Sequence, residues 1–218
     1  MKVKEKNNRK ILQFITGGML PIMLIGGYIW PYVGFGIAVM MVGFLTLSFF
    51  KGRVWCGWAC PRGAFMERYF HGLSLHIRIP AFFKALWFRL FVIAALMTSF
   101  VMQLILSGGD LSKIGMVFVR MCIVTSIIAI PLGMIYKPRV WCSFCPMGTI
   151  QGFLGRTRNL LHIDEKDCSS CNLCEKVCPI QTNPSSYKKE GVVESKDCIK
   201  CGNCVLNCPK KVVDFKNK

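Results

Sequence analysis

Hydrophobic residues along this chain fall into four long runs, followed by a region with a different pattern. The runs lie at about residues 11–30, 32–50, 85–106 and 117–136. Each is long enough to span a bilayer as a helix, which takes about 20 residues. From about Leu160 onward the long apolar runs give way to closely spaced cysteines, turn residues and short apolar segments. The pattern predicts a four-span transmembrane domain at residues 1–160 and a small second domain at residues 161–218.

Composition and charge support a membrane protein. Of the 218 residues, 53% are hydrophobic, the mean hydropathy is +0.43 and the formal net charge is +17. Basic residues precede the first span, occupy the connection between the second and third, and follow the fourth, whereas the other two connections carry only Lys113. The positive-inside rule therefore predicts a multi-pass protein of a bacterial or archaeal cytoplasmic membrane, with both termini and the second domain in the cytoplasm. No basic helix or aromatic RNA-binding motif accompanies the charge, so we expect the lipid bilayer and no nucleic acid as a partner.

The second domain contains one cysteine motif twice. Cys168-x-x-Cys171-x-x-Cys174-x-x-x-Cys178-Pro179 recurs as Cys198-x-x-Cys201-x-x-Cys204-x-x-x-Cys208-Pro209. This doubled spacing is the bacterial signature of two 4Fe-4S clusters, in which the fourth cysteine of each run ligates the other cluster. It predicts two ligand sets: Cys168, Cys171, Cys174 and Cys208 for cluster 1, and Cys198, Cys201, Cys204 and Cys178 for cluster 2. Two zinc knuckles or a disulfide framework are the alternatives. A tetrahedral zinc site requires neither the third two-residue step nor the paired Cys-Pro, and a reducing cytoplasm favours metal ligation over structural disulfides.

A second pair of cysteine motifs lies in the membrane part. Lys51-Gly-Arg-Val-Trp-Cys56-Gly-Trp-Ala-Cys60-Pro61-Arg-Gly63 is echoed by Lys137-Pro-Arg-Val-Trp-Cys142-Ser-Phe-Cys145-Pro146-Met-Gly148. Each copy follows an even-numbered span, so the membrane part is predicted to consist of two repeats, each a helix pair with a cysteine loop on the cytoplasmic face. Proline directly after Cys60 and Cys145 predicts that a helix begins there.

Three interpretations of Cys56, Cys60, Cys142 and Cys145 remain open. The four thiols could ligate an additional iron-sulfur cluster or another soft metal. They could carry out reversible dithiol chemistry, although the βαβ context of a thioredoxin motif is lacking. The Cys-Pro turns could also be structural only. The neighbouring Trp55, Trp58 and Trp141 are at positions typical of membrane-surface anchors.

The second domain is predicted to be a small α+β bacterial 2×4Fe-4S ferredoxin-like domain. Residues 189–193 and 212–215 read as short strands around the two cysteine motifs. The predicted fold class is thus an all-α four-helix membrane part with a ferredoxin domain attached. His71 and His76, between the second and third spans, could contribute to a quinone pocket, but histidines on such a surface are more often solvated.

Over nearly its whole length the chain resembles membrane ferredoxin subunits of quinol dehydrogenases that feed periplasmic nitrate reductase, and the related methylamine-utilisation, NosR and cytochrome-oxidase-assembly (CcoG) proteins. The four spans, the two Cys-Pro loops and the terminal pair of cluster motifs carry the resemblance. It implies electron exchange between the membrane quinone pool and redox partners. The family's loops have the form Cys-x-x-x-Cys-Pro, which Cys56 to Cys60 keeps, whereas Cys142 to Cys145 is one residue shorter.

We therefore expect an iron-sulfur electron-transfer protein, acting as a subunit of an oxidoreductase. It would pass electrons between the quinone pool or a membrane partner and a cytoplasmic ferredoxin, flavodoxin or oxidoreductase subunit. One alternative is a metal reductase, for example of copper, acting at the four loop cysteines. A redox-sensing or assembly subunit is the other.

Overall fold

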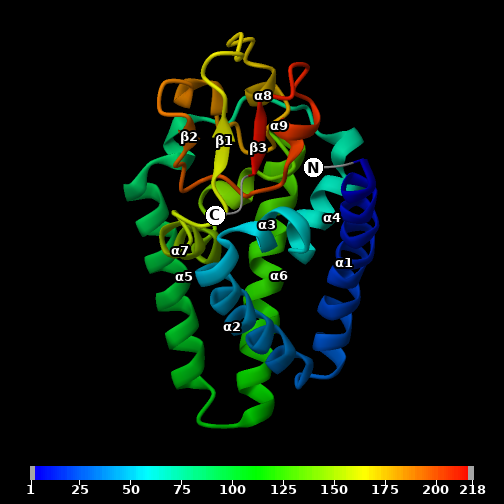
Figure 1. Cartoon of the computed structure of the whole chain (residues 1–218). Coiled ribbons are helices and arrows are strands. Elements are labelled where there is room, and N and C mark those ends of the chain that lie inside the picture. The colour runs from blue at the N-terminus through cyan, green and yellow to red at the C-terminus, as the bar shows by residue number, and fades with distance from the viewer. Residues whose placement is uncertain (1–2, 216–218) are drawn as a thin grey trace.

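The structure is a computed structural model that describes residues 3–215 of the chain, with side chains from Asn7 onward. Four long helices form its membrane part. They run side by side along the long axis of the molecule (Figure 1), and they are α1 (Val3–Ile29), α2 (Val33–Lys51), α5 (Leu86–Leu106) and α6 (Leu111–Ile135). Within the described chain these four helices are long and apolar enough to cross a membrane. The four predicted spans are therefore confirmed as helices. α6 begins earlier than predicted because Asp110 caps it, accepting a hydrogen bond from the backbone N–H of Ser112.

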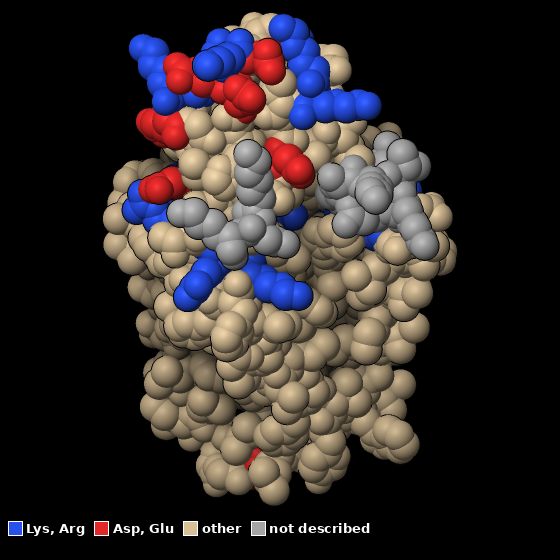
Figure 2. Space-filling model, in the orientation of Figure 1, with Lys and Arg blue, Asp and Glu red and all other residues tan. Residues whose placement is uncertain are grey.

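Charge is distributed unevenly over the molecule. In the view of Figure 2, Lys, Arg, Asp and Glu gather at the end that carries the small domain, and the opposite half is almost free of charge. Large apolar side chains are exposed along the long helices, such as Ile22 on α1, Phe91 on α5 and Ile127 on α6. Such an exposed apolar surface fits a lipid environment.

Each Cys-Pro loop folds into a short helical segment followed by a helix that begins at proline. The first loop contains α3 (Val54–Trp58) and α4 (Pro61–Tyr69), and the second contains the 3-10 turn η3 (Val140–Ser143) and α7 (Pro146–Leu154). Cys60 and Cys145 occupy the N-cap positions of α4 and α7, as predicted. Proline suits the first position of a helix because the N–H that it lacks would have no helical partner there. The 3-10 turns η1 (His71–Leu73) and η2 (Ala81–Lys84) follow α4.

The small domain is built on a three-stranded antiparallel sheet. Its strands are β1 (Leu161–Ile163), β2 (Val192–Val193) and β3 (Val213–Phe215), in the order β2-β1-β3. The sequence pattern predicted β2 and β3 but missed the central strand. Leu161 of β1 pairs with Val193 on one side and Phe215 on the other. The short helices α8 (Leu173–Lys176) and α9 (Asn203–Leu206) and the 3-10 turn η4 (Pro184–Tyr187) complete the domain.

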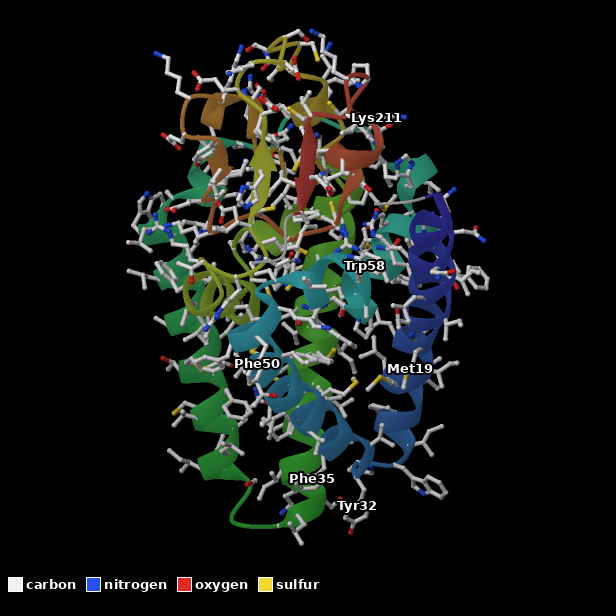
Figure 3. All side chains as sticks on the ribbon, viewed as in Figure 1. Met19, Tyr32, Phe35, Phe50, Trp58 and Lys211 are labelled. Carbon is white, nitrogen blue, oxygen red and sulfur yellow. The ribbon has the colours of Figure 1, made fainter. Side chains whose placement is uncertain are left out.

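Hydrogen bonds and ion pairs join the small domain to the membrane part. Arg89 of α5 forms an ion pair with Asp197 at 2.7 Å, and Arg53 donates to the carbonyl oxygen of Lys196 at 3.2 Å. Trp58 lies at this interface (Figure 3) and donates through its indole N–H to the carbonyl oxygen of Lys200 at 3.2 Å. The interface fixes the cysteine motifs of the small domain directly against the cysteine loops.

The interpretation of two loop tryptophans as membrane-surface anchors is wrong. Trp141 is buried, with 7% of its surface exposed, and packs against Phe144 in a core cluster. Trp141 is buried within the membrane part itself, in a cluster with Phe83 of η2 and Ala129 of α6, whereas Trp58 contacts the small domain.

Candidate iron-sulfur centres

The eight cysteines of the small domain line two separate cavities. Each cavity contains three cysteines of one motif and the Cys-Pro cysteine of the other. The first is lined by Cys168, Cys171, Cys174 and Cys208, and the second by Cys178, Cys198, Cys201 and Cys204. The fold thus brings together the two sets of thiols that the spacing singled out.

Backbone conformation follows the same repeat. Six residues within or directly after the two motifs have φ between 52° and 76°, in the left-handed region. They form three pairs at equivalent positions: Ser170 and Lys200, Asn172 and Gly202, and Gln181 and Lys211. Left-handed conformations cost a non-glycine residue about 1–3 kcal/mol and persist where the surrounding structure requires them. Here they turn each loop tightly enough to bring its cysteines to a common cavity.

The two cavities differ in burial. Cys171 of the first cavity is exposed, whereas Cys201 of the second is buried. Burial raises the pKa of Cys201 to about 12, since a thiolate loses its hydration there. The sulfur of Cys178, which is half-buried, accepts a hydrogen bond from the backbone N–H of Thr182 at 3.3 Å. The second cavity therefore excludes water more completely than the first.

The cysteine geometry differs from that of a site for one metal ion. Among the described residues, no three His, Cys, Asp or Glu side chains converge closely enough to hold a single ion. Zinc would draw its sulfurs to about 2.3 Å from one point. A cubane instead places each sulfur on a different iron, so its four ligands surround a cavity. The donor set of each cavity fits a 4Fe-4S cluster.

The four cysteines of the membrane loops also gather at one place. Cys56 lies in α3 and Cys142 in η3, while Cys60 and Cys145 cap the following helices. Burial raises the pKa of Cys56 to about 11 and that of Cys142 to about 12. Cys60 and Cys145 contribute to both increases, so they lie near both thiols. Gln151 of α7 accepts a hydrogen bond from the Cys56 thiol at 3.0 Å.

Two arginines cross between the loops in a reciprocal way. Arg53, three residues before Cys56, donates to the carbonyl oxygen of Cys142 at 2.8 Å. Arg139, three residues before Cys142, donates to the carbonyl oxygen of Cys56. Burial alone would lower the pKa of Arg53, but the neighbouring Cys56, Cys142 and Asp197 raise it.

Glycines make room for both guanidinium groups. A Cβ atom on Gly63 would lie 2.8 Å from Nη1 of Arg139, and one on Gly148 would lie 2.5 Å from Nη2 of Arg53. Each glycine is the third residue after the second cysteine of its loop. Each loop therefore accommodates the arginine of the other.

Several buried polar groups around the loop cysteines have no hydrogen-bond partner among the described residues. Buried donors are rarely left unpaired, because each one costs about 1–3 kcal/mol. The unpaired atoms belong to residues beside the loop cysteines in sequence or bonded to the loops: the indole nitrogens of Trp55 and Trp141, the hydroxyls of Ser143 and Thr149, and Nε of Arg53. Donors and a buried cation suit an anionic, sulfur-rich group, so the loop site also fits an iron-sulfur centre.

The loop cysteines pack directly against the second cavity. Cys56 belongs to one buried cluster with Cys201, Ile180 and Ile199, and Cys142 and Cys178 contact that cluster. The sites in the membrane part and in the small domain are therefore contiguous.

Sequence reasoning missed a buried charge network beside the loops. Glu67 of α4 forms ion pairs with Arg139 at 2.6 Å and with Arg9 at 2.9 Å. Burial would raise the pKa of Glu67, but Arg139 and Arg9 hold it below its ordinary value. Arg9, Arg53 and Arg139 flank the spans, as the charge pattern indicates, but their side chains are buried and do not face water or lipid headgroups. One sequence signal was available: Glu67 is an acidic residue in a strongly basic stretch.

Comparisons with known proteins agree with this chemistry. A family model described as a 4Fe-4S binding domain matches residues 33–80 and 120–163, which contain the two Cys-Pro loops, and a model described as a 4Fe-4S dicluster domain matches residues 160–209. The chain is 29% identical over 143 residues to an uncharacterized protein of Methanocaldococcus jannaschii. That alignment covers 63% of this chain and 55% of the relative, so the chain spans little more than half of the relative's length. No solved structure matches. The family matches and the four apolar helices support a membrane-associated iron-sulfur protein.

Proposed function

We propose that this chain is a membrane-anchored electron-transfer protein that links a redox partner in the cytoplasm to the quinone pool or another acceptor or donor in the membrane. One observation carries the proposal. Cysteines of the small domain and cysteines of the membrane loops pack in a single buried cluster. Such contiguity is what stepwise electron transfer between centres needs, and a purely structural use of the loops does not require it.

The proposed ligands are the two crossed sets of cysteines. Cys168, Cys171, Cys174 and Cys208 would hold cluster 1, and Cys198, Cys201, Cys204 and Cys178 would hold cluster 2, which supports a ferredoxin domain at residues 161–218. When bound, 4Fe-4S clusters accept and donate single electrons, at potentials set by hydrogen bonds to sulfur and by solvent exposure. The Thr182 N–H stabilises negative charge on the Cys178 sulfur. The exposure of Cys171 makes the cluster 1 site the contact point for a ferredoxin, flavodoxin or oxidoreductase subunit.

A third iron-sulfur centre is proposed on Cys56, Cys60, Cys142 and Cys145. The unpaired buried donors beside these cysteines and the two arginines between the loops support an anionic resident group. The burial of Cys56 favours this group over copper as a substrate, because a metal ion that is reduced and released needs an open path.

The reciprocal arginines also support the proposed arrangement of two helix-pair repeats. Arg53 and Arg139 hold equivalent places in the two loops and make equivalent bonds to the opposite loop. Two loops of unrelated structure would not be expected to form the same hydrogen bond to each other in both directions. The charged end seen in Figure 2 fits a cytoplasmic orientation of the small domain under the positive-inside rule.

Iron and sulfide analysis of anaerobically purified protein, combined with EPR, tests this proposal. The three centres predict about twelve irons per chain, whereas clusters in the small domain alone predict about eight. Replacing Cys56 and Cys142 by serine should remove the loop centre and stop transfer to quinone, while clusters 1 and 2 remain reducible. Unchanged iron content and unchanged quinone reduction in this variant would refute the loop centre. Zinc in place of iron would refute the whole proposal.

A further inference from the structure

A polar cavity of about 420 Å³ lies where α1, α4 and α9 meet. Its lining comes from both parts of the chain: Arg9, Lys10, Glu67, Arg68 and His71 of the membrane part, Asn203 of α9, and Asn207 directly after α9. The cavity contains none of the proposed cluster ligands. Its place at the charged end of the apolar helices corresponds to the surface of the membrane.

Positive charge dominates the lining. Three cationic side chains, those of Arg9, Lys10 and Arg68, face one carboxylate, that of Glu67. Glu67 is already bound by Arg9 at 2.9 Å and by Arg139 at 2.6 Å. Its single negative charge is shared among Arg139, Arg9 and Arg68, so the lining keeps an excess of positive charge.

Neither Lys10 nor Arg68 forms an ion pair with a described residue. Nε and Nη2 of Arg68 donate to the neutral side-chain oxygen of Gln13, at 3.1 and 2.9 Å. Burial lowers the pKa of Arg68. The Glu67 carboxylate raises that pKa, whereas the nearby cations Arg9 and Arg139 lower it further. A bound anion would relieve this repulsion between like charges.

A pair of aromatic rings lies beside the residues that line the cavity. Phe14, one helical turn below Lys10, stacks on Tyr69, the neighbour of Arg68, with ring centroids 5.6 Å apart. Both rings are exposed, and the Tyr69 hydroxyl donates to the carbonyl oxygen of Phe14 at 3.3 Å. Aromatic rings of this kind are typical of the headgroup level of a bilayer.

We propose that the cavity binds a phosphate group, supplied by the headgroup of an anionic phospholipid whose chains lie against Phe14 and Tyr69. Basic pockets at the cytoplasmic ends of membrane helices recognise such headgroups through charge and hydrogen bonds. Arg9 also donates to the side-chain oxygen of Asn203 at 2.7 Å. The lipid therefore occupies the junction of α1, α4 and the small domain and stabilises it. This inference does not depend on electron transfer.

The test uses full-length protein with its iron-sulfur centres intact, in nanodiscs of phosphatidylcholine with or without phosphatidylglycerol. We expect phosphatidylglycerol to raise the melting temperature of the wild type and to remain bound in native mass spectrometry. Lys10→Gln and Arg68→Gln should each weaken both effects, and the double variant should abolish them. Arg156→Gln is the matched control, since Arg156 is an exposed cation that pairs with Glu194 outside the cavity.

Three results would overturn the proposal. The first is equal lipid retention by the wild type and the double variant. The second is a loss of retention in Arg156→Gln as large as in the cavity variants, which would indicate a general surface charge effect. In the third, inorganic phosphate added to phosphatidylcholine nanodiscs stabilises the protein while phosphatidylglycerol does not, which would make free phosphate the ligand. If Arg68→Gln fails to fold, Lys10→Gln alone decides, because Lys10 is exposed.

Discussion

Replacing Glu67 by glutamine should destabilise the junction between the two parts of the chain. Glu67 is the shared counterion of Arg139, which is fully buried, and of Arg9. Gln13 also donates to Glu67 through its amide at 3.1 Å. Glutamine keeps the shape and one acceptor but removes the negative charge, so two buried guanidinium groups lose their counterion.

The structure sets the size of this effect. Removing one partner of a buried ion pair costs about 3–5 kcal/mol, because the remaining charge stays buried without compensation. Glutamine retains part of the hydrogen bonding, so we expect the lower end, about 3 kcal/mol. For a chain of this size 1 kcal/mol lowers the melting temperature by about 2–4 °C, which gives a decrease of about 6–12 °C.

Thermal unfolding of the detergent-solubilised protein, followed by circular dichroism, measures this decrease. Glu194→Gln is the control, because Glu194 is 55% exposed and its partner Arg156 lies 3.6 Å away. An exposed pair of this kind contributes about 0–1 kcal/mol. Equal melting temperatures for the two variants at neutral pH would refute the reasoning.

The pH dependence gives a second test of the same residue. The folded-state pKa of Glu67 lies below the ordinary glutamate value of 4.5. The stabilisation by Glu67 is therefore fully present above pH 4.5 and is lost as the pH falls through the lowered pKa. The difference between the wild type and Glu67→Gln should shrink on acidification. A difference independent of pH would show that lost packing, and not charge, destabilises the variant.

Three further predictions concern the centres and their surroundings. In Gly57→Ala, the new Cβ would clash with the carbonyl oxygen of Ile199, 2.2 Å away. The small domain should therefore separate from α3 and be digested faster in limited proteolysis. A digestion rate equal to that of the wild type would contradict this. Arg53→Gln should lower the midpoint potential of the loop centre in an EPR titration, because it removes a buried cation beside Cys56 and Cys142; an unchanged potential at unchanged iron content would count against the assignment. Cys204→Ala should remove about four irons and prevent reduction of the loop centre through the small domain; continued reduction would show that electrons bypass cluster 2.

The sequence predicted those features that depend on local spacing. The number and approximate positions of the spans followed from hydrophobic runs, although α1 and α6 begin earlier than predicted. Proline after Cys60 and Cys145 marked the starts of α4 and α7 correctly. The cysteine spacing also predicted which thiols line a common cavity. These features need no knowledge of how distant segments pack.

Features that depend on tertiary packing were missed. Strand β1 has only three residues, Leu161–Ile163, and became recognisable only through its pairing with β2 and β3. In the sequence, Arg9, Arg53 and Arg139 resemble the basic residues that set the orientation of a membrane protein. Only the fold reveals that their side chains are buried. The interior role of Trp141 was hidden in the same way, because it depends on packing against Phe83 of η2 and Ala129 of α6, which are distant in sequence.

The reciprocal arginines imply that neither cysteine loop is complete by itself. Arg53 holds the backbone of the second loop and also the carbonyl oxygens of Lys196 and Asp197 in the small domain. Arg139 holds the first loop and is neutralised by Glu67. A buried guanidinium without these partners would carry a large desolvation cost. Both helix pairs and the small domain must therefore be in place before the four loop thiols gather, so correct assembly of the whole chain is a condition for forming the centre at the membrane surface.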